Sequence, residues 1–267
     1  MAFARPKKRF SQNFLTDRNL AQKIVALLEI EKSDTILEIG TGRGILTEII
    51  ATTEAKLITF EIDRTLMPDL ITKFKKYDNV TVLNEDFLRA NPSDHTIGAF
   101  KLIGNIPYDI TSPLLDWITA HRDAISRAVI TTQKELADRI SSGPGSKNWA
   151  PISILTQLFF RIKKCLSIPP QAFYPRPKIR SSTLLLEPLT GYYNIRNYEH
   201  FAGIVHAAFS QRRKRLINNL AQLPGCDKSL IEKVVKSLGW DRNIRAEQIT
   251  IEGFIRLAEA FVPANNC

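Results

Sequence analysis

The stretch LEIGTGRG, residues 37–44, decides how this chain folds. It continues an apolar run that starts near Thr35, and a short apolar run that ends in a turn predicts a buried strand. Three glycines follow at alternate positions, and the apolar residues of 45–50 predict a helix directly after them. Glycine permits positive φ and lacks a Cβ, so this turn lets the backbone approach a ligand closely. Taken alone, the motif is also compatible with an ordinary βα turn.

Strands and helices alternate outward from this motif. We expect short buried strands at residues 35–39, 56–60, 80–83, 101–103, 128–132 and 182–186, with helical stretches between the first five. Asp17 is expected to cap an earlier helix that ends near Leu28. This order predicts an α/β fold with a mainly parallel sheet, covered on both faces, that gathers ligands at the carboxyl ends of its strands.

Beyond Gly191 only helical patterns remain. They cover residues 196–209, 212–222, 229–238 and 248–261. Before them, we expect a surface loop at 143–145 and a rigid, extended turn region at 169–177. The chain therefore divides into a large domain, residues 1–190, and a small all-helical domain, residues 191–267.

The composition favours an anionic partner and a reducing environment. Lysine and arginine outnumber aspartate and glutamate by 37 to 27, and the net charge of +10 suits a nucleic acid better than a membrane. Cys165, Cys226 and Cys267 lie far apart, which argues against a disulfide framework and a metal site. No apolar run is long enough to span a bilayer. We expect a soluble, cytoplasmic monomer without a metal ion.

Acidic residues after the next two strands indicate a nucleoside cofactor. Glu61 follows the second strand about 20 residues beyond the glycines, where a carboxylate can accept both hydroxyls of a ribose. The spacing G-x-G-x-G, with Glu38 two residues before the first glycine, favours S-adenosylmethionine over NAD. Asp86 follows the third strand and can accept a hydrogen bond from an adenine amine, while an apolar neighbour covers the ring. The alternative for Asp86 is a solvated loop acid.

The most specific motif follows the fourth strand, at residues 104–108 (GNIPY). An exocyclic adenine amine is a poor nucleophile because its lone pair is delocalised into the ring. The Asn105 Oδ1 and the Ile106 carbonyl can accept its N–H bonds, and Pro107 keeps Ile106 extended. Tyr108 offers a face on which the base can stack. A plain Asn-x-Pro turn is the alternative.

Two further segments suit an RNA substrate. Residues 173–178 (FYPRPK) combine an aromatic clamp, Phe173, with the cations Arg176 and Lys178; alternatively, Phe173 packs inward in a proline-stiffened connector. The basic run 212–215 is expected at the start of a helix. Positive charges there are unfavourable with respect to the helix dipole unless an anion lies near. The basic residues of this run and of the N-terminal arm are Arg212, Arg213, Lys214 and Arg215, and Arg5, Lys7, Lys8 and Arg9.

These motifs together resemble the KsgA-type ribosomal RNA adenine dimethyltransferases, which are related to the Erm-type methyltransferases. The likeness covers nearly the whole chain and is carried by residues 12–15, 38–44, 61–63, 85–86, 105–108, 133–135, 173–178, 211–214 and 245–247. It implies a class I methyltransferase (Rossmann-like) fold with a seven-stranded sheet. Thr41 stands where the family usually has proline, and Ile106 stands where it usually has leucine, a spelling common in the Erm-type enzymes.

The resemblance also implies the site and the substrate. Residues expected to bind S-adenosylmethionine are Gln12, Asn13, Leu15, Gly40, Gly42, Glu61, Ile62, Asp86, Phe87 and Asn105. Those expected to hold the adenine are Asn105, Ile106, Pro107, Tyr108 and Phe173. The implied reaction is dimethylation of two adjacent adenines near the 3′ end of 16S RNA in a pre-assembled small ribosomal subunit. The alternatives are an Erm-type enzyme acting on 23S RNA, a non-catalytic RNA-binding assembly factor of the same fold, and a DNA or protein methyltransferase.

Overall fold

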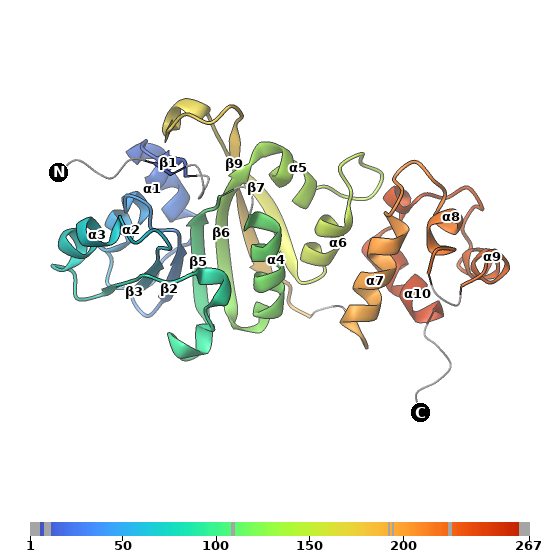
Figure 1. Ribbon diagram of the computed structural model, residues 1–267. Coiled ribbons are helices and arrows are strands. Elements are labelled where there is room, and N and C mark those ends of the chain that lie inside the picture. Colours follow the sequence, from blue (N-terminus) through green and yellow to red (C-terminus); the bar gives the residue numbers. More distant parts are fainter. Residues whose placement is uncertain are drawn as a thin grey trace. The chain divides into compact units, whose positions relative to one another are not determined.

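The computed structural model describes residues 6–7, 12–107, 110–191, 193, 195–223 and 226–261 (Figure 1). The chain forms two compact units. The first comprises Met1–Asp138 with Phe160–Leu189, and the second comprises Arg139–Phe159 with Thr190–Cys267. Among the predicted functional residues, those that lie outside the described part are Arg5, Lys8, Arg9 and Tyr108.

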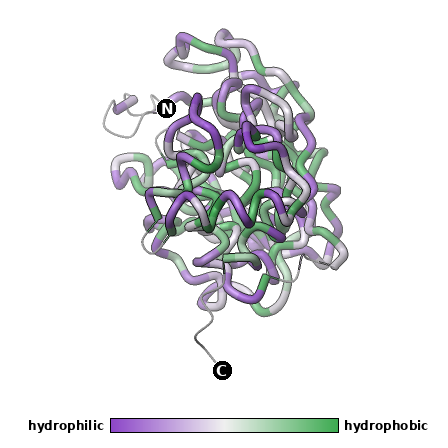
Figure 2. The backbone as a smooth tube through the Cα atoms, turned by 90° about the vertical axis from the view of Figure 1, so that its right-hand side faces the viewer, coloured by the Kyte–Doolittle hydropathy of each residue, from purple (hydrophilic) through white to green (hydrophobic). Residues whose placement is uncertain are grey.

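A seven-stranded sheet forms the centre of the first unit, in the order β4-β3-β2-β5-β6-β9-β7. Its strands are β2 (Thr35–Ile39), β3 (Lys56–Phe60), β4 (Val80–Leu83), β5 (Phe100–Asn105), β6 (Ile125–Gln133), β7 (Phe160–Ile168) and β9 (Ser181–Pro188). The strands from β4 to β6 are mutually parallel, and β9 is antiparallel to both of its neighbours. The prediction of a mainly parallel sheet is therefore confirmed. Hydrophobic stretches, in green, alternate with hydrophilic stretches, in purple, along the backbone (Figure 2).

The predicted strands agree with the structure except at the last edge. β2, β3 and β4 begin and end where the sequence pattern placed them, and β5, β6 and β9 are longer than expected. β7 was not among the predicted strands. Its sequence, FRIKKCLSI, mixes cations with apolar residues because β7 is an edge strand with much of its length exposed. Lysines on an exposed edge oppose pairing with another chain.

Helices cover both faces of this sheet. On one face, α1 (Arg18–Ala26) and α2 (Ile45–Ile50) contribute to one apolar cluster with β2, β3 and β6. On the other face, α4 (Thr111–Ala120) places Thr111 Oγ1 3.0 Å from Thr132 Oγ1 of β6. α3 (Met67–Phe74) packs beside β4. Asp17 caps α1 as predicted, since its Oδ1 accepts from the Leu20 N–H at 3.0 Å, although α1 ends two residues before Leu28.

The chain reverses its direction across the sheet between β2 and β5. From β2 it moves outward through β3 and β4, and it then returns to add β5 on the other side of β2. Gly104 of β5 lies opposite Ile39 of β2, where a Cβ would stand 2.8 Å from the Ile39 carbonyl oxygen. The carboxyl ends of these two strands therefore meet closely, and such a switch point is where open α/β sheets bind ligands.

A separate two-stranded sheet joins segments far apart in the sequence. β1 (Phe14–Leu15) pairs antiparallel with β8 (Phe173–Tyr174), with Phe14 opposite Tyr174 and Leu15 opposite Phe173. The Thr16 N–H extends this contact by donating to the Ala172 carbonyl at 2.8 Å. This pairing connects the N-terminal segment to the proline-rich turn region.

The second unit is helical. Its helices are α6 (Pro151–Gln157), α7 (Tyr198–Ala208), α8 (Leu216–Leu220), α9 (Lys228–Ser237) and α10 (Ile251–Ala260). The four helices predicted after Gly191 are all present, but α8 is shorter than the expected 212–222. The basic run 212–215 lies in the turn that leads into α8, with Arg215 at the N-cap of that helix, so it precedes the helix start rather than forming its first turn. α8 begins only where the buried Leu216 and Ile217 enter the apolar core.

Residues 139–159 belong to the second unit, whereas the sequence pattern placed them in the first domain. This segment follows α5 (Lys134–Ile140) and includes the predicted loop at 143–145. The Gly145 N–H donates to the Glu247 carbonyl at 2.6 Å, and the Trp149 Nε1 donates to the Ile249 carbonyl at 2.9 Å. These two bonds hold the loop against the chain that leads into α10. Nothing in the described part of the chain forms a helix of the length and apolarity needed to cross a membrane.

Candidate active site

A cavity of about 240 Å³ lies in the first unit, where the ends of β2, β3 and β5 meet. All of the residues predicted to bind the cofactor border it: Gln12, Asn13, Leu15, Gly40, Gly42, Glu61, Ile62, Asp86, Phe87 and Asn105. Ile106, Pro107 and Phe173, predicted for the adenine, border it as well. The structure therefore brings the predicted cofactor and substrate residues together in one cavity.

The glycine turn forms one wall of this cavity. Gly42 and Gly44 have positive φ, 55° and 74°. A Cβ on Gly44 would stand 2.6 Å from the Phe74 ring, and one on Gly42 would stand 3.0 Å from the Phe14 ring. Both positions therefore require glycine for its backbone conformation and for the close packing around it. Such a cradle fits a nucleoside cofactor that lies against the backbone.

Glu61 is held in place by the backbone on both sides. Its Oε2 accepts from the Gly42 N–H and its Oε1 accepts from the Asp63 N–H, each at 2.8 Å. Burial raises the pKa of Glu61, while these two bonds oppose the shift. Each carboxylate oxygen has a second lone pair, so both can still accept a ribose hydroxyl. The geometry fits the predicted role.

Glu38 is a buried acid that the sequence reasoning used only as a spacing marker. Its side chain is 1% exposed and accepts from the Thr47 Oγ1 of α2 at 2.6 Å. Burial raises the pKa of Glu38 to about 7. An acid within an otherwise apolar strand was the available sign of this environment. Glu38 ties β2 to α2 beneath the glycine turn and borders the cavity.

The third strand end supplies a slot suited to a flat ring. Asp86 caps the short 3-10 helix η2 (Phe87–Arg89), since its Oδ1 accepts from the Leu88 N–H at 3.1 Å. The Phe87 ring is buried and makes an edge contact with Phe60 at 5.1 Å. Ile62 also borders the cavity and is 48% exposed. An adenine can lie between these apolar side chains with its amine near Asp86.

Asn105 is oriented by a bond to the N-terminal segment. Its Nδ2 donates to the Asn13 carbonyl at 3.0 Å, so the Oδ1 is left as the accepting end of the amide. The Ile106 N–H donates to the Thr131 carbonyl of β6 at 2.9 Å, which anchors the next peptide to the sheet. The carboxamide of Asn105 and the adjacent Ile106 peptide are therefore each anchored by a hydrogen bond to another segment, and both residues border the cavity.

Phe173 packs inward. It is 5% exposed and belongs to an apolar cluster with Leu15, Ile168 and Ala172, because the pairing of β1 with β8 directs it toward α1. The structure thus realises the inward-packing alternative, although Phe173 also borders the cavity. The exposed aromatic of this segment is Tyr174.

The predicted RNA-binding cations differ in their surroundings. Those that are exposed are Arg176, Lys178, Arg213, Lys214 and Arg215. Arg212 is also exposed, but its guanidinium donates to the Lys147 carbonyl and helps to hold the 143–145 loop. Lys7 forms an ion pair with the buried Asp63 at 2.7 Å. These two cations therefore make contacts within the protein that the sequence pattern did not indicate.

Other functional contacts were missed because they join distant segments. The Arg43 guanidinium carbon lies 4.9 Å from the centre of the Phe14 ring and 5.2 Å from that of Tyr174. This contact connects the glycine turn to both strands of the two-stranded sheet. No local pattern could have revealed it, because β1 and β8 are about 160 residues apart in the sequence.

The fold and site together define a class of protein. A mainly parallel sheet with a glycine cradle, a buried carboxylate and an oriented amide at one switch point is the arrangement of an S-adenosylmethionine-dependent methyltransferase that acts on an amine. The chain belongs to the ribosomal RNA adenine dimethylase family, whose model matches residues 4–261. Enzymes of this family use S-adenosylmethionine as the methyl donor.

Curated relatives and solved structures agree with this assignment. The chain is 39% identical to the ribosomal RNA small subunit methyltransferase A of Syntrophus aciditrophicus (strain SB), over 96% of this chain and 94% of that one. It is 38% identical to the protein of the same name from Francisella tularensis subsp. novicida (strain U112), over 94% and 96%.

A crystal structure of a dimethyladenosine transferase from Plasmodium falciparum superposes with a TM-score of 0.79 and 25% identity, covering 91% of this chain and 95% of that one. The 23S rRNA methyltransferase ErmE superposes with a TM-score of 0.72 and 26% identity, covering 93% and 99%. The predicted family resemblance and fold class are therefore confirmed.

Proposed function

We propose that this chain transfers methyl groups from S-adenosylmethionine to the N6 amines of two adjacent adenines near the 3′ end of 16S ribosomal RNA. The proposal is supported by the relatives named ribosomal RNA small subunit methyltransferase A, which align over nearly their whole length. The structural observation that carries it is the bond from Asn105 Nδ2 to the Asn13 carbonyl, which turns the amide oxygen into the acceptor.

The acceptor end of the cavity activates the amine by hydrogen bonding. Asn105 Oδ1 and the Ile106 carbonyl each accept one N–H of the adenine N6 group. These bonds favour a tetrahedral nitrogen, whose lone pair is withdrawn from the ring and can attack a carbon. Pro107 contributes by restricting Ile106 to an extended conformation. In the transfer, the N6–methyl bond would form as the sulfur–methyl bond of the donor breaks, and the nitrogen would then release one proton to water. Positioning supplies most of the rate in this scheme, so no strong base is needed.

The donor end orients the cofactor. Glu61 accepts the ribose hydroxyls, Asp86 accepts from the adenine amine, and Phe87 and Ile62 pack against the ring. The glycine turn allows the backbone to approach the rest of the molecule. When bound, S-adenosylmethionine supplies a methyl group on a positively charged sulfur, which is already activated for transfer. Tyr108 remains the proposed contact of the target base, whereas Phe173 contributes an apolar border of the cavity from the cluster into which it packs.

The substrate side is proposed to be RNA within a small ribosomal subunit. The exposed Arg176 and Lys178 follow β8 next to the cavity, and Arg213, Lys214 and Arg215 are exposed in the second unit. Cations of this kind bind phosphates and make affinity depend on salt. We include in this proposal that the protein acts as a monomer, without a membrane, in the cytoplasm, where ribosomal subunits are assembled.

The test is methyl transfer to purified ribosomal particles. Small and large subunits that lack these methyl groups are incubated separately with labelled S-adenosylmethionine, and dimethyladenine in each RNA is measured by mass spectrometry. We expect two adjacent dimethyladenines in the small-subunit RNA only. Labelling of large-subunit RNA alone would replace this proposal with the Erm-type reaction. Absence of transfer to either particle by a protein that binds RNA would favour the non-catalytic assembly factor.

A further inference from the structure

Asp63 is a buried carboxylate next to the cavity that the proposed reaction does not use. Its side chain is 2% exposed, and it is not among the residues that border the cavity. It accepts from Lys7 Nζ at 2.7 Å, from Gln12 Nε2 at 3.1 Å and, within its own turn, from the Thr65 hydroxyl at 2.7 Å. Burial raises the pKa of Asp63, but the bonds from Lys7 and Thr65 outweigh it and lower the pKa to about 2. Asp63 is therefore charged at neutral pH, and both of its carboxylate oxygens accept hydrogen bonds within the protein.

Two of these contacts lead directly to the donor site. Gln12 borders the cavity, and its neighbour Asn13 accepts the bond that orients Asn105. On the other side, the Asp63 N–H donates to Glu61 Oε1, the carboxylate proposed to bind the ribose. Asp63 thus connects the N-terminal segment that borders the cavity with the strand end that carries the ribose contact.

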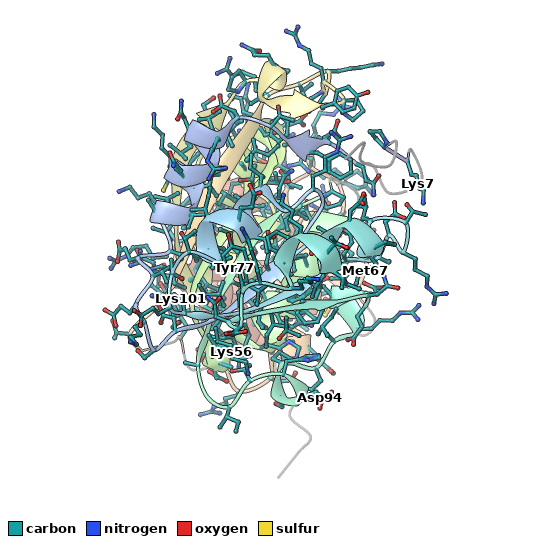
Figure 3. The ribbon with its side chains drawn as sticks, turned by 90° about the vertical axis from the view of Figure 1, so that its left-hand side faces the viewer. Lys7, Lys56, Met67, Tyr77, Asp94 and Lys101 are labelled. Carbon is teal, nitrogen blue, oxygen red and sulfur yellow. The ribbon has the colours of Figure 1, made fainter. Side chains whose placement is uncertain are left out.

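Lys7 completes this connection. Its Nζ also donates to Thr65 Oγ1 at 2.8 Å, and its backbone N–H donates to Gln12 Oε1 at 2.8 Å. Figure 3 shows Lys7 beside the start of α3 at Met67, far from Lys56 and Lys101 near the amino ends of their strands. Its charge is therefore neutralised within the protein at the end of the sheet where the cavity lies. A cation that binds RNA phosphate is expected to be exposed, whereas Lys7 is paired with Asp63.

We propose that Asp63 and Lys7 are positioning residues for the methyl donor, which act by holding Gln12 and Asn13 against the cavity. Lys7 then contributes to donor affinity rather than to RNA affinity, unlike the exposed cations proposed to bind RNA. This inference rests on the proposed function, because it requires S-adenosylmethionine to occupy the cavity.

The charge of the donor makes this inference testable. S-adenosylmethionine carries a net positive charge at neutral pH, so removal of a nearby lysine charge should by itself strengthen binding. A loss of affinity on removing Lys7 must therefore come from the lost positioning. We expect Lys7→Met to raise the Kd for S-adenosylmethionine about tenfold, the scale of one hydrogen bond to a charged group.

The experiment measures donor binding by titration calorimetry on the full chain, together with RNA binding at several salt concentrations. Lys7→Met and Asp63→Asn should each raise the donor Kd and the donor KM, and their effects should not be additive when the two changes are combined. Lys7→Arg should retain most of the affinity. Lys75→Met removes an exposed lysine charge from the same unit and serves as the matched control.

The outcomes separate the two proposals. The positioning role is overturned if Lys7→Met binds the donor as well as wild type does. A salt slope of RNA binding that is reduced by about one in this variant would then assign Lys7 to RNA. An equal loss of donor affinity in Lys75→Met also overturns it, because the effect is then one of general charge. Failure of the wild-type protein to bind S-adenosylmethionine would instead refute the proposed function.

Discussion

The two ends of the cavity use polar groups in opposite ways. At the donor end, both Glu61 oxygens accept from backbone N–H groups, one from Asp63 beside it and one from Gly42 at the end of the neighbouring strand. At the acceptor end, Asn105 is a neutral amide whose direction depends on the carbonyl of Asn13, which is 92 residues away in the sequence. Under the proposed roles, the donor contact is fixed by the ends of neighbouring strands, whereas the orientation of the amine acceptor depends on the N-terminal segment.

The largest expected effect tests the acceptor end. Asn105→Ala should lower kcat about 100- to 1000-fold, the scale for removing one preorganised hydrogen-bonding group from a reacting centre. The donor Kd should change only a few-fold, because the donor-end contacts remain. Single-turnover methyl transfer and calorimetry measure the two quantities. Asn91→Ala, at an exposed asparagine, is the matched control. Wild-type turnover by Asn105→Ala would exclude the amide as the amine acceptor.

The next effect concerns Glu38 beneath the donor end. Burial raises the pKa of Glu38 from 4.5 to about 7, so the folded state holds this proton more tightly than the unfolded state. The resulting stabilisation is complete below pH 4.5 and is lost as the pH rises through 7, and it amounts to about 3 kcal/mol. Glu38→Gln should therefore show a flatter stability profile between pH 4.5 and 7, measured by denaturant unfolding. Asp63, whose pKa is lowered to about 2, acts in the opposite direction below this window. If the free energy of unfolding of Glu38→Gln changed with pH in the same way as that of wild type, the raised pKa of Glu38 would be contradicted.

A smaller effect is expected at the ribose contact. Glu61→Gln replaces one accepting oxygen with an NH2 group, which faces a backbone N–H and cannot accept a hydroxyl. The donor Kd should rise about thirtyfold, consistent with the loss of a hydrogen bond to a charged group. The kcat at saturating donor should stay within a few-fold of wild type. A change in kcat without a change in donor affinity would show that the two ends of the cavity are not separable.

The smallest effect is expected for Asp86→Asn. Asparagine can keep the cap on the Leu88 N–H with its single oxygen, and the second lone pair of that oxygen can still accept from the adenine amine. We therefore expect the donor Kd to rise only about threefold, since the neutral amide is a weaker acceptor than a carboxylate. Calorimetry on this variant beside Glu61→Gln ranks the two acidic contacts. A larger loss in Asp86→Asn would move the main recognition of the donor from the ribose to the base.

Much of the donor site could be predicted from the sequence because its signals are local. The glycines, Glu61 and Asp86 each follow a short apolar run directly, and parallel strands bring their carboxyl ends to one edge whatever lies between them. The exposed cations of the second unit were likewise visible as a run. β7 was missed because the composition of an edge strand follows solvent exposure rather than apolar periodicity.

The sequence by itself determined the ends of β2, β3 and β4, the glycine turn and the family, because each depends on residues that are adjacent or regularly spaced. Only the tertiary structure decided that Phe173 packs inward, that Lys7 pairs with Asp63, and that residues 139–159 join the helical unit. These outcomes depend on contacts between segments brought together by folding. No local pattern of charge or hydrophobicity specifies which distant partner a side chain will meet.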